Sequence, residues 1–321
     1  MPETSADEPG RSTVLLVRRT FLEDALRRAV LRRSGVTYTS GTEVSGLCFA
    51  TTARPRRVIG VRTPRGRLLA DLVIATGGRR DRTFGWLREG GAAAPWRFEE
   101  SSRLTMYSRF YQLRPGAVPG PLDDPISAGG IHDGFAAKLL LAGGKVFSVS
   151  FGILPGDPEL QALREPAFFA AAAGRLPATA AWVDPHRSRP ITPRPLAIGG
   201  LRNRLLRLVA QDGTPVVHGL HLAGDSLCLT NPVFALGVSV AFEQAVIIAE
   251  AVRRHPADLA AQMLDVDKAV TERIAPQFDA VLAQDRTRIE RWRAAIASPA
   301  VADDPSGPTR HQLVRELRRV A

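Results

Sequence analysis

The feature that most constrains the fold of this 321-residue chain is the segment from Gly219 to Ala241. It predicts an apolar strand ending at Gly224, a loop that contains Asn231-Pro232, and a helix of small residues opening near Gly237. This order places Asp225 at the carboxyl end of a strand, where open α/β sheets bind ligands. The free N–H groups of a helix N-terminus suit an anion or an electron-rich ring edge, and a glycine there allows close approach. The alternative is an ordinary strand–loop–helix unit with an incidental Asp.

The N-terminal part of the chain predicts a strand followed by a helix. Residues 1–13 are polar and are expected to be disordered, and residues 14–17 form a short apolar strand. A helix is predicted over 21–33, because its apolar positions recur at helical spacing. Thr20 and Glu23 are expected to form a capping box at its start.

The middle of the chain predicts a β-meander and then alternating strands and helices. Residues 58–61 and 68–72 flank a Pro64-Arg65-Gly66 turn, and the buried strand 72–75 ends at Thr76-Gly77-Gly78. No internal repeat is found. Further strands are predicted over 104–113, 145–153 and 216–223, and helices over 166–175, 177–183, 235–254, 259–273, 277–296 and 312–320.

Composition limits the class of protein. Hydrophobic residues make up 45% and charged residues 23% of the chain, which is ordinary for a globular protein and excludes wholesale disorder. The net charge of +11 invites a nucleic-acid interpretation. However, all but three of the 43 basic residues are arginines, and they are scattered without a basic stripe interleaved with aromatics. We therefore expect a solvated charged surface and no nucleic-acid partner.

The cysteines and histidines predict no metal site. Cys48 and Cys228 lie far apart without metal-ligand spacing, so neither a zinc site nor a disulfide framework is expected. His218 and His221 fall on opposite sides of a predicted strand and cannot share a metal. No apolar run reaches the ~20 residues that span a bilayer. We expect a cytoplasmic protein without a membrane span.

No side chain is identified as a catalytic acid, base or nucleophile. The sequence contains no Ser/His/Asp arrangement with the glycines of a nucleophile elbow. Tyr107, Arg109 and Tyr111 alternate on a predicted strand and therefore share one face. That face either lines a substrate pocket or forms the solvated side of a sheet.

The segment from Gly219 to Ala241 resembles the second flavin-binding motif of a known family. The family is that of the FAD-dependent oxidoreductases that share the fold of para-hydroxybenzoate hydroxylase and geranylgeranyl reductase. The resemblance implies that Asp225, which follows Gly224, binds the ribityl chain of FAD. It also implies that Pro232 and Gly237 flank the isoalloxazine ring.

Two further segments are similar to the same family, in the same order. The helix that begins near Arg19 is similar to the one whose leading Arg contacts the flavin, and Arg19 is the match. Residues 70–77 resemble the strand that ends in an Ala-Thr-Gly turn near the cofactor, which implies a contact at Gly77. Ala235 stands where the family usually has a glycine, so the backbone there is expected to approach the flavin less closely.

The resemblance implies an α/β fold with an incomplete FAD-binding (Rossmann-like) layer, a mixed β-sheet substrate domain and C-terminal helices. Residues 147–164 and 182–203 resemble the substrate domain of an actinobacterial branch of the family. The expected boundaries are a disordered tail over 1–13, the first part of the FAD-binding domain over 14–96, the substrate domain over 97–200, the second part of the FAD-binding domain with C-terminal helices over 201–297, and a linker with a terminal helix over 298–321.

The family's opening Gly-x-Gly-x-x-Gly unit has no counterpart in the sequence. That unit binds the ADP half of FAD. About a hundred residues of the family's beginning are expected to be missing, more than one βαβ unit of ~30 residues. A truncated gene product, a mis-called start or half of a split protein would each explain this.

The function that the resemblance implies is that of an FAD-dependent oxidoreductase. It would be monooxygenase- or reductase-like, acting on a small apolar organic substrate with NAD(P)H as electron donor. The Trp-x-Trp-x-Ile-Pro stretch of the flavin halogenases is not recognisable, which argues against halogenation. Two alternatives remain, a truncated and catalytically inactive flavoprotein fragment and a basic nucleic-acid-associated protein.

Overall fold

The computed structural model describes residues 17–52, 54–297 and 309–319. It divides into two compact units, each made of segments that are far apart in the sequence. The predicted α/β class, with several sheets and C-terminal helices, is confirmed. Unit 1 comprises Met1–Tyr38, Met106–Ala197 and Ala295–Ala321, and unit 2 comprises Thr39–Thr105 and Ile198–Ala294.

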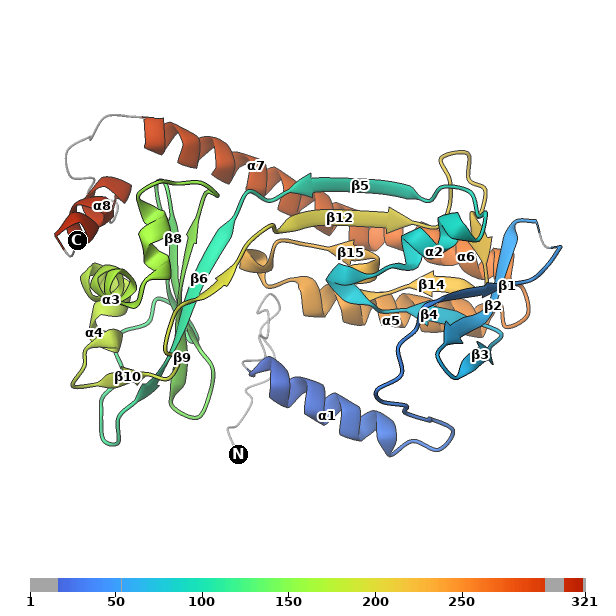
Figure 1. Cartoon of the computed structure of the whole chain (residues 1–321), viewed down its shortest axis with the longest axis horizontal. Coiled ribbons are helices and arrows are strands. Elements are labelled where there is room, and N and C mark those ends of the chain that lie inside the picture. Colours follow the sequence, from blue (N-terminus) through green and yellow to red (C-terminus); the bar gives the residue numbers. More distant parts are fainter. Residues whose placement is uncertain (1–16, 53, 298–308, 320–321) are drawn as a thin grey trace, which may run out of the picture. The chain divides into compact units, whose positions relative to one another are not determined.

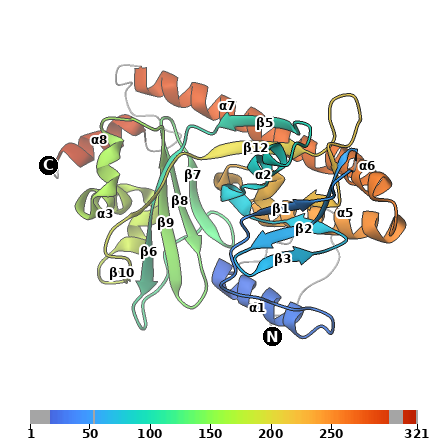
Figure 2. The same cartoon turned by 45° about the vertical axis from the view of Figure 1, so that its right-hand side comes forward.

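Unit 1 is built on a six-stranded sheet. Its strand order is β10-β6-β9-β8-β7, and β11 also pairs with β6. Helices α3, α4 and α8 lie on one face of this sheet (Figures 1 and 2). Their apolar side chains pack with the sheet into one core, whereas helix α1 buries none of its residues. The elements are α1 (Arg19–Leu31), β6 (Thr105–Leu113), β7 (Ser127–Ile131), β8 (Ala136–Leu141), β9 (Val146–Ile153), α3 (Pro166–Arg175), α4 (Pro177–Val183), β10 (Ser188–Pro190), β11 (Leu196–Ile198) and α8 (Arg310–Arg318).

The alternating face of β6 packs into the core of unit 1. Tyr107, Arg109 and Tyr111 are all buried, so a solvated face, one of the two interpretations of the sequence, is wrong. The ring of Tyr111 stacks on Phe147 with centroids 5.4 Å apart. Arg109 donates to the backbone carbonyls of residues 192 and 193, each at 3.2 Å. Arg109 therefore holds β6 to the segment that follows β10.

The described residues of unit 2 form three separate sheets. Strand β2 pairs antiparallel with β1 and β3 and parallel with β13, and β4 pairs in parallel with β14 alone. Strand β12 lies between β5 and β15 and is antiparallel to both (Figure 1). The strands are β1 (Gly46–Phe49), β2 (Arg56–Thr63), β3 (Gly66–Leu69), β4 (Val73–Ala75), β5 (Trp96–Ser101), β12 (Arg202–Arg207), β13 (Val217–His218), β14 (Leu220–Leu222) and β15 (Cys228–Leu229).

The helices of unit 2 supply most of its core. The buried positions of α5 (Gly237–Arg254) recur at helical spacing and pack with β14 and with α6 (Leu259–Ala269). Helix α6 continues through one π-helical turn (Val270–Ile274) directly into α7 (Ala275–Ala297). Both ends of that turn are buried, so it lies where this long helix meets the core. The short helix α2 (Thr83–Glu89) follows the exit from β4.

The sequence predicted the long elements better than the short ones. The bounds of α3 and α4 are confirmed, as is the hairpin of β2 and β3. The single strand predicted over 216–223 is wrong, because Gly219 divides it. Gly219 has φ +73°, and a Cβ there would lie 2.4 Å from the carbonyl oxygen of Val58. The chain therefore kinks, and β13 and β14 pair with different strands.

The start of α1 also differs from the prediction. The Thr20–Glu23 capping box is wrong, because the helix already begins at Arg19 and its N-cap, Arg18, makes no side-chain cap bond. Residues 1–13 and 298–308, predicted as a tail and a linker, lie outside the described residues, as does all but the last residue of the predicted strand 14–17.

The described residues were compared with what a membrane span, a metal site or a disulfide requires. Within the described parts of the chain, no helix is long and apolar enough to cross a membrane. The same residues contain no group of three or more His, Cys, Asp and Glu side chains that could hold a metal ion. Cys48 and Cys228 are buried free thiols.

Candidate functional site

Two loops meet where β4 and β14 end. The strands pair in parallel, with Val73 opposite Leu220 and Ala75 opposite Leu222, so their carboxyl ends reach the same edge. The loops that leave them carry the predicted residues Gly77, Gly224 and Asp225. We call residues 77–81 together with 224–226 the loop junction. It occupies the kind of edge where open α/β sheets bind ligands.

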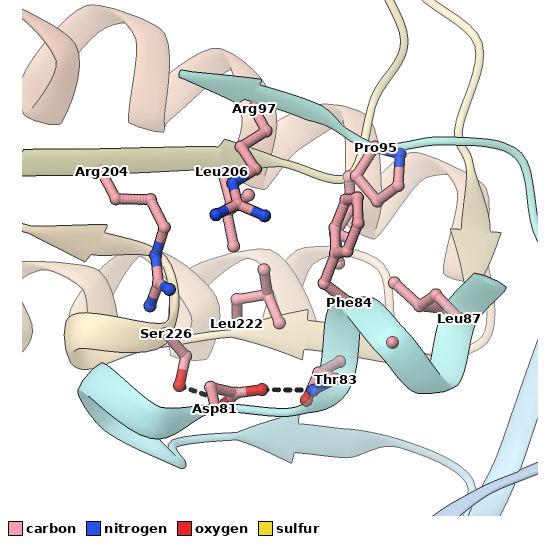
Figure 3. Close-up of a pocket in the computed structure, with 12 residues that line it drawn as sticks. Asp81, Thr83, Phe84, Leu87, Pro95, Arg97, Arg204, Leu206, Leu222 and Ser226 are labelled. Atoms are coloured by element: carbon pink, nitrogen blue, oxygen red, sulfur yellow. Dashed lines mark hydrogen bonds between the residues drawn. The ribbon is translucent and has the colours of Figure 1, made fainter. Parts of the chain in front are cut away.

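Asp81 fastens the loop junction by three hydrogen bonds. Its Oδ2 accepts from the Oγ of Ser226 at 2.5 Å, and its Oδ1 accepts from the N–H of Thr83 at 2.6 Å (Figure 3). The Oδ2 also accepts from the backbone N–H of Gly77 at 3.1 Å. Ser226 Oγ in turn accepts from the N–H of Gly78 at 2.9 Å. One buried hydroxyl and one carboxylate thus tie the exit of β4 to the exit of β14.

Arg204 supports the loop junction from β12. Its Nη2 donates to the backbone carbonyl of Asp225 at 3.0 Å and to that of Gly78 at 3.5 Å. Its Nε is buried and has no hydrogen-bond partner among the described residues. Successive side chains of a strand point to opposite faces, so Arg204 and its neighbour Asn203 contact different parts of unit 2. Asn203 is fully buried on the other face.

The glycines leave the junction open to a close approach. Gly78 has φ +72° and Gly224 has φ +62°, in the left-handed region that glycine adopts without strain. A Cβ at either position, or at Gly237, would meet no described atom within 4 Å. A flat or extended ligand can therefore lie directly against the backbone here.

The Asn-Pro loop leads into α5. The side chain of Asn231 accepts from the N–H of Val233 at 3.2 Å and begins a short turn over Pro232–Phe234. Ala235 follows with φ +54°, a left-handed conformation that is rare for a residue with a Cβ. Helix α5 then begins at Gly237 without a side-chain cap, which leaves the N–H groups of its first turn to other acceptors.

A pocket of about 220 Å³ adjoins the loop junction. In Figure 3, Arg97 from β5 extends toward Leu222, and Arg204 from β12 extends toward Ser226. Phe84 of α2 lies at the side of the pocket. The guanidinium of Arg97 lies 5.4 Å from the centre of the Phe84 ring. Pockets that hold drug-sized ligands have about 300–1,000 Å³, so this one suits a smaller molecule. Its lining is Asp81, Thr83, Phe84, Gly85, Leu87, Pro95, Arg97, Arg204, Leu206, Leu208, Leu222 and Ser226.

Cys228 lies close behind the junction and is not a nucleophile. Burial raises the pKa of its thiol to about 12, and the negative charge of Asp225 acts in the same direction. The reactive form of a cysteine is its thiolate. At neutral pH this cysteine therefore behaves as a small apolar residue.

The structure distributes the predicted cofactor residues unevenly. Gly77, Gly224 and Asp225 lie at the loop junction, and Pro232 and Gly237 lie on the loop and helix that follow β15 in the same unit. Arg19 belongs to unit 1, in the first turn of α1, where its Nε donates to Glu23 at 2.5 Å.

Three supporting residues were missed by the sequence analysis. Asp81 had a local signal, because an Asp two residues before a helix start suits a cap or Asx turn. Ser226 had only its place after Gly-Asp. Arg204 had no signal in the sequence. The chain has 43 basic residues, and nothing beside this arginine indicates that it would contact backbone carbonyls.

No protein-family model and no curated protein sequence matches this chain. Solved structures do match over most of it. The myxobacterial chondrochloren halogenase CndH, a variant of FAD-dependent halogenases, superposes with a TM-score of 0.63 at 16% identity, covering 95% of this chain and 73% of that chain. PqsL, a probable FAD-dependent monooxygenase from Pseudomonas aeruginosa, gives 0.60 at 13% identity, covering 85% and 71%. The p-nitrophenol 4-monooxygenase PnpA from Pseudomonas putida DLL-E4 gives 0.53 at 16% identity, covering 95% and 71%.

These likenesses establish the fold. The chain has the fold of FAD-dependent monooxygenases and halogenases, as the resemblance in the sequence implied. At identities of 13–16% the likeness carries the architecture and no particular reaction.

Proposed function

We propose that this chain is an FAD-dependent oxidoreductase, monooxygenase- or reductase-like, that acts on a small apolar organic molecule with NAD(P)H as electron donor. The observation that carries the proposal is the loop junction, where Gly77, Gly224 and Asp225 meet at the ends of two parallel strands. It lies in a fold that solved FAD-dependent monooxygenases and halogenases share.

The residues present fit the flavin and ribityl half of FAD. Asp225 is the acceptor proposed for the ribityl hydroxyls, and its backbone is held in place by Arg204. Pro232 and Gly237 are proposed to flank the isoalloxazine ring, whose electron-rich edge suits the first-turn N–H groups of α5. The open space beside Gly224 and Gly237 supports this placement, because a side chain there would fill it.

The remaining proposed contacts are Gly77 in the loop junction and Arg19 in α1. When bound, FAD would supply the redox chemistry, and the protein would supply binding, orientation and exclusion of water. The chain's own part in the reaction is therefore to fix the cofactor and to position the substrate. No side chain is assigned as an acid or base.

The first experiment is a visible absorbance spectrum of the purified protein, repeated after addition of excess FAD and desalting. We expect a retained flavin band near the wavelengths of free FAD. Asp225→Ala should weaken FAD binding about tenfold or more, because a charge-assisted hydrogen bond is lost. Asp212→Ala is the matched control, since Asp212 accepts local hydrogen bonds from Thr214 in an exposed loop of the same unit.

The outcomes separate the alternatives. A protein that stays colourless and leaves the fluorescence of added FAD unchanged would overturn the proposal. A bound flavin without NAD(P)H oxidation over a panel of small aromatic substrates would favour an inactive flavoprotein fragment. Equal weakening by Asp212→Ala would show that Asp225 has no special role.

A further inference from the structure

A closed circuit of buried hydrogen bonds lies behind the Asn-Pro loop. Asp285 of α7 accepts from Nδ2 of Asn231 through Oδ1 and from Nδ2 of Asn203 through Oδ2, each at 2.7 Å. Asn203 Oδ1 then accepts from the backbone N–H of Asn231 at 2.7 Å. Asn203, Asn231 and Asp285 are each at most 1% exposed. The three residues come from β12, the loop and α7, all within unit 2.

The chemistry of the circuit allows one arrangement only. An ionised carboxylate accepts and never donates, so both amides must turn their NH₂ groups toward Asp285. Their oxygens are then left for backbone N–H groups: Asn203 takes that of Asn231, and Asn231 takes that of Val233 at 3.2 Å. The position and the direction of the chain at Asn231 are both fixed.

Arg288 completes the site. Its guanidinium lies 2.9 Å from Asp285 Oδ1 and also donates to the carbonyl of Ser102. The pair is almost fully buried, with side chains 3% and 1% exposed. Taking two charges out of water is costly, and apolar residues of similar volume often give equal or greater stability. A buried ion pair here is thus better explained by the geometry that it imposes.

We propose that Asp285 is a positioning residue that sets the Asn231–Gly237 segment in the geometry required to contact the flavin. This inference rests on the proposed function, because Pro232 and Gly237 are the residues assigned to the ring. Asp285 acts through Asn231 and touches neither cofactor nor substrate. Its effect reaches the left-handed Ala235 and the start of α5 through the turn that Asn231 begins.

The test is a reciprocal exchange of donor and acceptor. Asp285→Asn replaces one carboxylate oxygen by an NH₂ group, which cannot accept from Asn203 or Asn231. Asn231→Asp places a second carboxylate against that of Asp285, so the two repel each other. The double variant Asn231→Asp/Asp285→Asn restores one donor facing one acceptor between these two positions. It also moves the negative charge to residue 231 and turns the new NH₂ group toward the guanidinium of Arg288, so part of the circuit stays broken. Asn231→Ala keeps the Arg288–Asp285 pair, and it replaces Asp285→Asn if that variant does not fold.

Three measurements are made on each full-length variant. Hydrogen–deuterium exchange of residues 229–237 reports the loop without cofactor, and titration with FAD gives Kd. The midpoint potential of the bound flavin reports the surroundings of the ring, which a merely structural role would not move. We expect faster exchange, an FAD Kd raised about tenfold and a shifted potential in each single variant, with partial recovery in the double variant.

Arg286→Gln is the matched control, because it removes an exposed ion pair with Glu100 from the same helix, one residue away. It should change none of the three measurements. Unchanged loop exchange in both single variants would overturn the positioning role, whether or not FAD binds. Faster exchange with unchanged Kd and potential would overturn its use for the flavin. Wild-type protein that binds no FAD would instead overturn the proposed function, leaving the exchange data to decide the role in loop geometry.

Discussion

Ser226 and Asp81 are 145 positions apart in the sequence, yet the Oγ of one lies 2.5 Å from the Oδ2 of the other. Ser226 is fully buried and also accepts from the N–H of Gly78. A single hydroxyl therefore bridges the loops that leave β4 and β14. The proposed cofactor site depends on these two loops.

Replacing that hydroxyl should loosen unit 2. We expect Ser226→Ala to lower the free energy of unfolding by about 1–3 kcal/mol, since it leaves the half-buried N–H of Gly78 without its acceptor and removes a bond to a charged acceptor. Urea denaturation of the variant measures the change. Ser101→Ala is the control, because Ser101 accepts an exposed local bond from the N–H of Arg103 and its loss should cost less than about 0.5 kcal/mol. A smaller effect for Ser226 than for Ser101 would contradict the bridging role.

Ala235 should tolerate glycine better than any helical alanine. Its left-handed conformation carries a Cβ penalty of about 1–2 kcal/mol, which glycine would remove. Part of that gain is offset, because glycine also gives the unfolded chain greater conformational freedom. Ala235→Gly is expected to raise the free energy of unfolding by about 0.5–1 kcal/mol. Ala245→Gly, at an exposed interior position of α5, should lower it by about 1 kcal/mol. Chemical denaturation should give opposite signs, and equal signs would refute the strain assigned to Ala235.

The free energy of unfolding of unit 1 should fall at acidic pH because of Asp157. Burial raises the pKa of this carboxyl, but the hydrogen bond and charge of Arg310 and two backbone N–H groups outweigh it and hold the pKa below its usual value. The unfolded chain therefore takes up the proton first as pH falls. The stabilisation is complete above the ordinary Asp pKa of about 3.9 and is lost as pH falls through the lower folded value.

Arg310→Met tests this ion pair. Arg310 donates to both oxygens of Asp157 at 2.9 and 3.0 Å, and it is 5% exposed. Breaking a buried pair costs about 3–5 kcal/mol, and below pH 4 the difference from wild type should shrink. Arg318→Met is the control, since Arg318 is 75% exposed and its pair with Glu159 is worth at most about 1 kcal/mol. A difference that stays constant from pH 7 to pH 3 would contradict the assignment.

Cys228 should resist alkylation in the folded protein. With a pKa of about 12 and 3% of its surface exposed, its thiolate is scarce at pH 8 and difficult to reach. Iodoacetamide labelling of a Cys48→Ser variant, followed by mass spectrometry, isolates this thiol. We expect labelling only at the rate of unfolding, and complete labelling in denaturant. Rapid stoichiometric modification of the native variant would contradict the assignment of Cys228 as a buried, protonated thiol.

The sequence was informative wherever one residue type decides the local conformation. The exit of β4 at Gly77, the meander turn at Gly66 and the helix start at Gly237 were all foreseen, because glycine and proline act through their own backbone. The division of one predicted strand at Gly219 was not, because it follows from the approach of Val58, a residue far away in the sequence.

The same reason explains which parts of the site were missed. Asp81, Arg204 and Asp285 act on backbone groups and amides brought to them by the tertiary fold. Asp81 lies two residues before a helix start, but nothing in the neighbours of Arg204 and Asp285 along the chain distinguishes them from surface charges. Their roles become visible only in the folded structure. The Gly-Asp and Asn-Pro residues, in contrast, predict a loop by their own conformational preferences.

The π-helical turn between α6 and α7 gives the chain a tolerance for change in length. A π turn holds one more residue than the α-helical turn that it replaces, so the faces of the helices before and after it keep their alignment. Val270 and Ile274 both reach the core, and the exposed Thr271, Glu272 and Arg273 lie between them. A deletion of one of these three residues would leave an ordinary α-helix with its buried sides still aligned. This turn is therefore where a variant shortened by one residue has the best prospect of folding.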